Sequence, residues 1–113
     1  MKNLLLAVLL GLTSTVTLAN KPNASCDIKL GKETYKGNCV VSYNTYEKSW
    51  MVFGPNDTEL FEEIPYLDLQ VTGKNTRNAR TMIGDELIEF GTLTKSSSQC
   101  FANSKLHICY SMK

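Results

Sequence analysis

The sequence predicts a small all-β domain, either an antiparallel sandwich or a barrel, braced by two disulfides. Three observations predict this fold class. Apolar and polar residues alternate with a period of two, clusters of turn-forming residues separate the alternating runs, and four cysteines occur in only 113 residues. Short strands at regular spacing with turns between them are typical of sandwiches and barrels. The sequence contains no internal repeat and no linker-like segment, so we expect one domain.

The first half of the chain predicts four strands. Cys26, Ile28 and Leu30 alternate with polar neighbours, and Gly31-Lys32 is a turn signal before a return strand. The polar segment 20–25 is typical of a loose N-terminal arm. The expected strands are 26–30, 33–36, 39–43 and 49–53, and a turn cluster at 54–57 follows the last of them.

One segment in the middle of the chain predicts a short helix. Leu60, Phe61 and Ile64 would share one face of a helix over 58–64, with the acidic residues on the solvated face. Pro65 would end this helix, because proline lacks the amide donor that a helix needs. We therefore expect an all-β fold with at most this one short helix.

The second half of the chain predicts further short strands. Gly84-Asp85 separates two runs of strand-forming residues and is typical of a hairpin turn. The segments 73–78 and 96–99 are polar and are expected to form loops. The expected strands are 67–71, 80–83, 86–90, 92–94, 100–103 and 106–110.

Residues 1–19 have the three parts of a secretory signal peptide. Lys2 is the positive residue, Leu4 to Leu12 form a short apolar run, and Thr17-Leu18-Ala19 places small residues where a signal peptidase reads. A membrane anchor or a buried helix is the alternative, but the apolar run is too short to span a bilayer. We expect residues 20–113 to form the mature domain, periplasmic or secreted and not inserted in the membrane.

The four cysteines predict two disulfides, because an even number in a short exported chain is typical of a disulfide framework. A two-residue loop at 104–105 would place Cys100 opposite Cys109, within bonding range. A hairpin centred between residues 32 and 33 would likewise place Cys26 opposite Cys39. The local pairs Cys26–Cys39 and Cys100–Cys109 are favoured, and the main alternative connectivity ties the two ends of the domain together.

Sequence motifs at both ends of the mature chain resemble those of a group of small exported bacterial proteins of unknown function. The motif residues are Gly31-Lys32, Tyr35, Gly37, Cys39, Gly91-Thr92-Leu93, Cys100-Phe101-Ala102-Asn103 and Ile108-Cys109. In that group a hairpin closed by cysteine opens the domain, and a Gly-x-Leu strand leads into a second hairpin closed by cysteines. The resemblance does not cover the middle of the chain, and Phe101 stands where tryptophan is expected. It implies export, both disulfides and a β fold, and it carries no activity.

The charge balance excludes some classes of partner. The chain has 12 basic and 11 acidic residues, and Lys2 belongs to the signal segment. The mature domain is therefore close to neutral. Binding to nucleic acid needs a basic surface that displaces counterions, so we expect no nucleic-acid partner.

The titratable residues do not form a recognisable catalytic set. His107 is the single histidine, so no second imidazole is available for a metal site or for a catalytic triad. The acidic residues form two clusters, Glu59, Glu62 and Glu63 in one and Asp85, Glu86 and Glu89 in the other, and both are expected to be solvated. We expect no enzyme, no cofactor and no metal. A small hydrolase acting through the second cluster is the alternative.

The remaining candidates are residues that could contact a partner protein. Lys74, Arg77 and Arg80 form a basic run in the second half of the chain, with a spacing of three residues. Tyr46 is one of several aromatic residues that could anchor an interface. Solvated loop charge and core packing are the competing interpretations, and Trp50 is the best candidate for the core. We expect an exported binding module without catalytic activity, either an inhibitor of a cell-wall hydrolase or an envelope immunity protein. The alternative is a structural envelope protein that oligomerises through an exposed strand edge.

Overall fold

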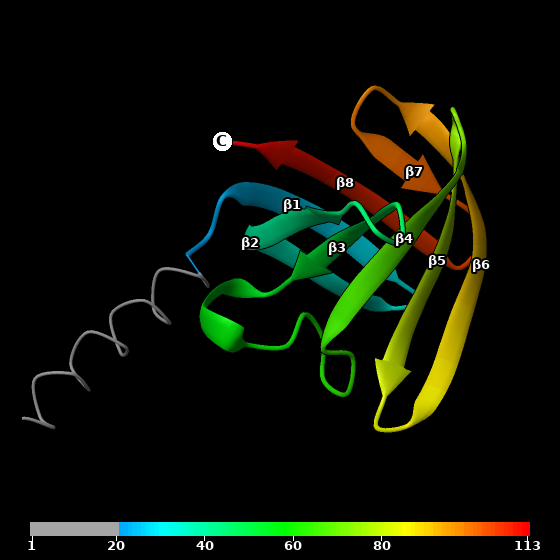
Figure 1. The fold of residues 1–113 in the computed structure, drawn as a ribbon. Helices are drawn as coiled ribbons and strands as arrows, with labels where there is room; N and C mark the ends of the chain where they lie inside the picture. Colours follow the sequence, from blue (N-terminus) through cyan, green and yellow to red (C-terminus); the bar gives the residue numbers. More distant parts are fainter. Residues whose placement is uncertain (1–20) are drawn as a thin grey trace, which may run out of the picture.

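The computed structural model describes residues 21–113, with the backbone alone at Asp57, and the expected signal segment 1–19 lies outside this range. Eight antiparallel strands close into one barrel, which confirms the all-β prediction and selects the barrel over the sandwich (Figure 1). The elements are β1 (Ala24–Leu30), β2 (Glu33–Asn44), β3 (Ser49–Phe53), the 3₁₀ turn η1 (Pro55–Asp57), β4 (Tyr66–Gly73), β5 (Thr76–Ile83), β6 (Glu86–Ser97), β7 (Cys100–Ala102) and β8 (Leu106–Met112).

The strand order is the simplest that closes a barrel. Each strand pairs with the next one in the sequence, and β8 returns to β1 with Ile28 opposite Ile108. Every strand from β1 to β8 therefore has a neighbour on both sides. The β5–β6 hairpin extends beyond its other partners, because residues 81–83 lie past the pairing with β4 and residues 86–93 lie past the pairing with β7. Among the described residues, no helix has the length and apolarity needed to cross a membrane.

Alternation along the strands fills the barrel with aliphatic side chains. On β1 the buried residues alternate with exposed ones, and the same holds for much of β8. The most completely buried aliphatic side chains are Ile28, Val41, Val52, Leu67, Leu69, Leu93, Leu106 and Ile108. Trp50 packs against this core but is only partly buried, so the prediction that it is a core residue is only half right.

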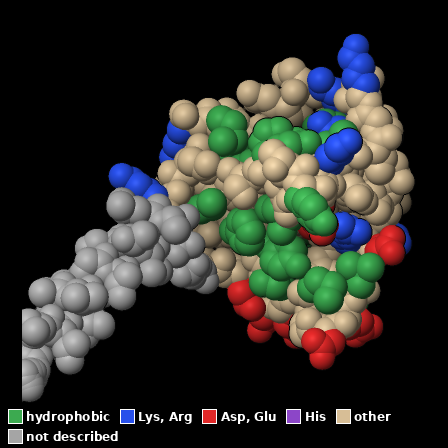
Figure 2. All heavy atoms as spheres, viewed as in Figure 1, with side chains coloured by type: hydrophobic (Ala, Val, Ile, Leu, Met, Phe, Trp, Pro, Cys, Tyr) green, Lys and Arg blue, Asp and Glu red, His purple; other side chains and the backbone are tan. Residues whose placement is uncertain are grey.

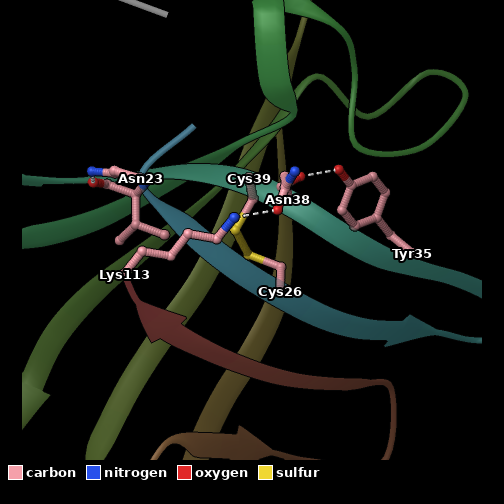
Figure 3. Close-up of a disulfide and its surroundings, with 7 residues drawn as sticks. Asn23, Cys26, Tyr35, Asn38, Cys39 and Lys113 are labelled. Atoms are coloured by element: carbon pink, nitrogen blue, oxygen red, sulfur yellow. Dashed lines mark hydrogen bonds between the residues drawn. A yellow bond between two sulfur atoms is a disulfide. The ribbon is translucent and has the colours of Figure 1, made fainter. Parts of the chain in front are cut away.

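Both favoured disulfides are present. Cys100 lies opposite Cys109 in the register predicted from the sequence, with 4.1 Å between their Cα atoms. Cys26 and Cys39 join β1 to β2 across a Cα distance of 5.9 Å (Figure 3). The second of these disulfides lies in the barrel interior, since Cys26 is 4% exposed and Cys39 is fully buried.

The register of the β1–β2 hairpin differs from the prediction by two residues. Leu30 pairs with Glu33, and Cys26 lies opposite Gly37 instead of Cys39. Gly31-Lys32 forms a two-residue loop in which Gly31 has a φ of 62°. A glycine with positive φ at the first loop position is typical of the tightest hairpin turns, and this turn sets the register. The Cys26–Cys39 disulfide therefore runs diagonally across the hairpin.

The predicted helix over 58–64 is wrong. Only the short turn η1 is helical here, and residues 61 and 64 form an isolated bridge in a tight turn. Leu60 and Phe61 are buried, as their apolar character predicted. Isolated helices of one or two turns are unstable, so packing these side chains against the barrel decides the backbone conformation instead.

Several strands are longer than the sequence predicts. β2 and β6 each run for 12 residues, whereas shorter separate strands were expected in both places. β5 begins at Thr76, so the expected loop over 73–78 shrinks to a turn at 74–75. The expected N-terminal arm is also partly ordered, because the Asn23 side chain exchanges two hydrogen bonds with the backbone of Val41, each 2.8 Å long. Pairing across the barrel overrides the weak local strand signal in these segments.

Candidate binding surfaces

The connections between strands alternate between the two ends of the barrel, because neighbouring strands are antiparallel. One end carries the β2–β3, β4–β5 and β6–β7 connections together with residue 21 and Lys113. The opposite end carries the β1–β2, β3–β4, β5–β6 and β7–β8 connections. In Figure 1 the β4–β5 turn and the β6–β7 loop lie at the top, and the β5–β6 turn lies at the bottom.

Charge is separated between these two ends. We call the first the basic end, and it carries Lys21, Lys48, Lys74, Arg77, Lys95 and Lys113, with Glu47 among them. We call the second the acidic end, and it carries Glu33, Glu59, Glu62, Glu63, Asp85, Glu86 and Glu89, with Lys29, Lys32 and Lys105 among them. On the face shown in Figure 2, the visible Asp and Glu side chains lie mainly at the lower end and the visible Lys and Arg side chains mainly over the upper half.

Two of the four predicted partner-binding residues lie at the tips of the basic end. Tyr46 is 92% exposed in the β2–β3 connection, and Lys74 is exposed in the β4–β5 turn. The Asn44 side chain accepts hydrogen bonds from the backbone amides of Tyr46 and Glu47, at 3.0 and 3.1 Å. This side-chain turn holds the β2–β3 connection in one conformation and presents the Tyr46 ring to solvent.

Arg80 lies elsewhere and is already paired. It sits on β5, on the outer face of the barrel, and its guanidinium lies 3.2 Å from the Asp68 carboxylate and 3.4 Å from Glu47. The interpretation of Arg80 as solvated charge is therefore wrong, because its side chain is only 23% exposed and is paired with two carboxylates. Its position in a strand agrees with the predicted strand 80–83.

Arg77 lies inside the mouth of the barrel at the basic end. It is two residues from buried Ala79 and so faces the same inner side of β5. Its guanidinium carbon lies 4.4 Å from the centre of the Phe101 ring, and Nη1 donates to the carbonyl oxygens of Gly73 and Thr76 at 3.3 and 2.9 Å. Stacking a guanidinium on an aromatic face is favourable.

Aromatic rings form the wall of this mouth. Trp50 lies 4.8 Å from Tyr43 and 6.1 Å from Tyr110, measured between ring centres. Burial raises the pKa of the Tyr110 hydroxyl above its usual range, and the nearby charge of Arg77 opposes this rise. The mouth encloses a cavity of about 420 Å³ lined by Trp50, Arg77, Lys95, Ser98, Gln99, Phe101, Tyr110, Ser111 and Met112.

A second surface, which we did not predict from the sequence, lies on the outer face near the acidic end. Met82, Ile83 and Leu87 in the β5–β6 hairpin are 37%, 39% and 46% exposed. Met82 lies opposite Leu87, and both line a hollow of about 300 Å³ beside Arg80. The apolar residues on either side of Gly84-Asp85 suggested a hairpin, but nothing in their pattern showed that these three would stay exposed.

Among the described residues, the candidates for catalysis or metal binding are His107, the neighbouring cysteines and the two acidic clusters. The Cys100, His107 and Cys109 ligand atoms lie within 4.8 Å of one another, but both sulfurs are in a disulfide. A disulfide sulfur is not the thiolate that metals bind. His107 is exposed, as expected, and the carboxylates of both acidic clusters are exposed as well. A glycosidase acid needs burial to raise its pKa, and these positions do not supply it.

Comparisons with known proteins found no matching family model, no matching curated protein and no matching solved structure. We therefore argue function from the two barrel ends described above.

Proposed function

We propose that this protein is an exported binding module without catalytic activity, and that its basic end blocks the acidic cleft of a hydrolase in the cell envelope. An immunity protein against an envelope-directed toxin would use the same surface in the same way. The observation that carries the proposal is the position of exposed Tyr46, Lys48 and Lys74 in the connections at one end of a closed barrel.

The chemistry of the expected partner complements this end. Enzymes that cleave glycosidic bonds place a pair of carboxylates on either side of the bond, so their clefts are acidic. Lys48 and Lys74 would be attracted to such a cleft and would raise the rate of encounter. Tyr46 would supply the buried aromatic anchor that carries much of the energy of a protein interface.

The scaffold also suits a binding role. Each disulfide fixes a hairpin, one next to each end of the described chain. A braced closed barrel loses little conformational entropy on binding, and this preorganisation favours affinity. Both disulfides are consistent with folding in an oxidising compartment, which supports the export expected from residues 1–19.

The proposal is tested by capturing hydrolases from an envelope extract with the mature protein and measuring their lytic activity. We expect capture and inhibition by the unmodified protein. We expect Tyr46→Ala and Lys74→Glu each to weaken binding by about tenfold or more, since each removes an anchor or reverses a charge at the contact. Lys32→Glu is the matched control, because Lys32 is an exposed turn lysine at the opposite end.

Equal binding by Tyr46→Ala, Lys74→Glu and the unmodified protein would contradict the proposal. So would an effect of Lys32→Glu as large as that of Lys74→Glu. Light scattering separates the alternative role as an oligomerising structural protein. We expect a monomer whose mass does not change with concentration.

A further inference from the structure

We propose that the barrel mouth is a binding site for a small organic anion that carries a planar ring. The ring would stack against Trp50 and Tyr110, and the anionic group would pair with Arg77 and Lys95. This proposal goes beyond the blocking role described above and does not depend on it, because it concerns the cavity inside the barrel and not the exposed tips.

The first observation is a guanidinium without an acidic partner. Among the side chains that the structure describes, no carboxylate lies within 4.0 Å of Arg77, whereas Arg80 on the same strand has two. The Nε atom of Arg77 is buried and has no hydrogen-bond partner. A charge partly removed from water is costly unless it is paired, so an anion in the mouth that contacts the accessible part of the guanidinium would offset this cost.

The second observation is the arrangement of the donors that Arg77 has left. Two backbone carbonyls occupy Nη1, and the Phe101 ring lies against the guanidinium. These contacts fix the orientation of the side chain without neutralising its charge. Nη2 is the nitrogen left for an anion, because Nη1 is occupied and Nε is buried. A charge-assisted hydrogen bond from this nitrogen to a carboxylate or sulfonate is stronger than one between neutral groups.

The third observation is the lining of the cavity. Trp50, Phe101 and Tyr110 supply aromatic surface, and Lys95, Ser98 and Gln99 supply a cation and polar groups at the rim. The volume of about 420 Å³ is within the range of small-molecule sites in proteins. Aliphatic side chains fill the middle of the barrel, so the space for a ligand is the hollow at the mouth. The combination selects a ligand with both a ring and a negative charge.

The mouth contains its own reporter, because Trp50 is the single tryptophan in the chain. We would titrate the mature protein with 2-naphthoate, an anion with a planar ring, and with 2-naphthamide, its neutral counterpart. Calorimetry gives both affinities, and the indole N–H resonance of Trp50 shows whether the probe occupies the mouth. We expect 2-naphthoate to bind at least about tenfold more tightly than 2-naphthamide, because it alone pairs with the guanidinium.

Arg77→Met is the decisive variant, and Arg80→Met on the outer face of the same strand is its matched control. We expect Arg77→Met to abolish the preference for the anion and Arg80→Met to leave it unchanged. Lys95→Met, at an exposed rim position, should reduce the preference for 2-naphthoate over 2-naphthamide about threefold. This variant replaces Arg77→Met in the test if Arg77→Met fails to fold. Far-ultraviolet circular dichroism reports the folding of each variant.

The proposal is overturned if the two probes bind equally, if neither shifts the Trp50 resonance, or if folded Arg77→Met keeps the preference. Its failure is distinguishable from failure of the proposed blocking role. Tyr46→Ala and Lys74→Glu should leave naphthoate binding unchanged while they weaken capture of a protein partner.

Discussion

Asn103 shows how one side chain can hold three segments of the barrel together. Its Nδ2 donates to the carbonyl oxygens of Phe90 and Thr92, at 2.9 and 3.2 Å. Its Oδ1 accepts from the backbone amides of Lys105 and Leu106, at 2.8 and 2.9 Å. Asn103 therefore ties the β7–β8 turn to β6 and leaves none of these backbone groups without a partner.

The two carbonyls that Asn103 reaches flank Gly91, where β6 bulges against β5. Gly91 has a φ of 92°, and a Cβ added there would lie 3.2 Å from the Asn103 nitrogen. A glycine is needed at this point because other residues rarely adopt such a conformation. The Gly-x-Leu motif at 91–93 and the asparagine at 103 thus belong to one structural unit, which their separation in the sequence does not reveal.

Asn103→Ala should lower the free energy of unfolding by roughly 2–4 kcal/mol, since it removes four hydrogen bonds of about 1 kcal/mol each. Urea denaturation followed by circular dichroism measures the change. Asn75→Ala, at an exposed turn position, is the matched control and should change stability by less than about 0.5 kcal/mol. Similar values for the two variants would show that the Asn103 contacts do not stabilise the barrel.

At the scale of the elements, the sequence predicts strands well where local signals are strong. The range 49–53 coincides with β3, and the Gly84-Asp85 turn and the Cys100–Cys109 register are confirmed. The β1–β2 register was missed because the hairpin was centred between residues 32 and 33, whereas the two-residue turn is centred between Gly31 and Lys32. The helix over 58–64 was missed because burial of Leu60 and Phe61 needs no helix.

The two disulfides should differ in their contribution to stability. Each closes a short loop and stabilises the fold by about 3 kcal/mol through the unfolded state. Cys26 and Cys39 are also buried in the core, whereas Cys100 and Cys109 are partly exposed. We expect Cys26→Ala/Cys39→Ala to be the more destabilising double variant, because it also leaves a cavity.

The same urea titration on both double variants checks this prediction. The test is which double variant loses more unfolding free energy, since both variants are compared with the same oxidised parent. A larger loss for Cys100→Ala/Cys109→Ala would contradict the assignment of the Cys26–Cys39 pair to the core.

At the scale of the whole molecule, the most informative feature is the separation of basic and acidic residues between the two barrel ends, which the net charge does not show. Residues 20–113 carry 11 basic and 11 acidic residues, since Lys2 is the one basic residue before them. The connections of the closed antiparallel barrel nevertheless lie alternately at two ends of opposite charge. The residues Lys74, Arg77, Arg80 and Tyr46 were chosen from the sequence as one set. The structure places Tyr46 and Lys74 at exposed tips, Arg77 in the mouth and Arg80 in an ion pair.

The separation of these four residues could not be predicted because it depends on where β5 begins. Lys74 falls in a two-residue turn, and a shift of the strand boundary by a few residues would leave Arg77 in solvent. Local sequence carries little information about such boundaries, which are set by pairing with β4 and β6. The fold class was therefore accessible from the sequence, whereas the binding surfaces required the topology.

Hydrogen–deuterium exchange of the mature protein, free and bound to a captured envelope partner, tests the central claim most directly. We predict slower exchange on binding in the three connections of the basic end, at 45–48, 74–75 and 98–99, and unchanged exchange at 84–85. Protection confined to 54–65 and 84–85, with the basic end exchanging as in the free protein, would contradict the claim that the basic end is the binding surface.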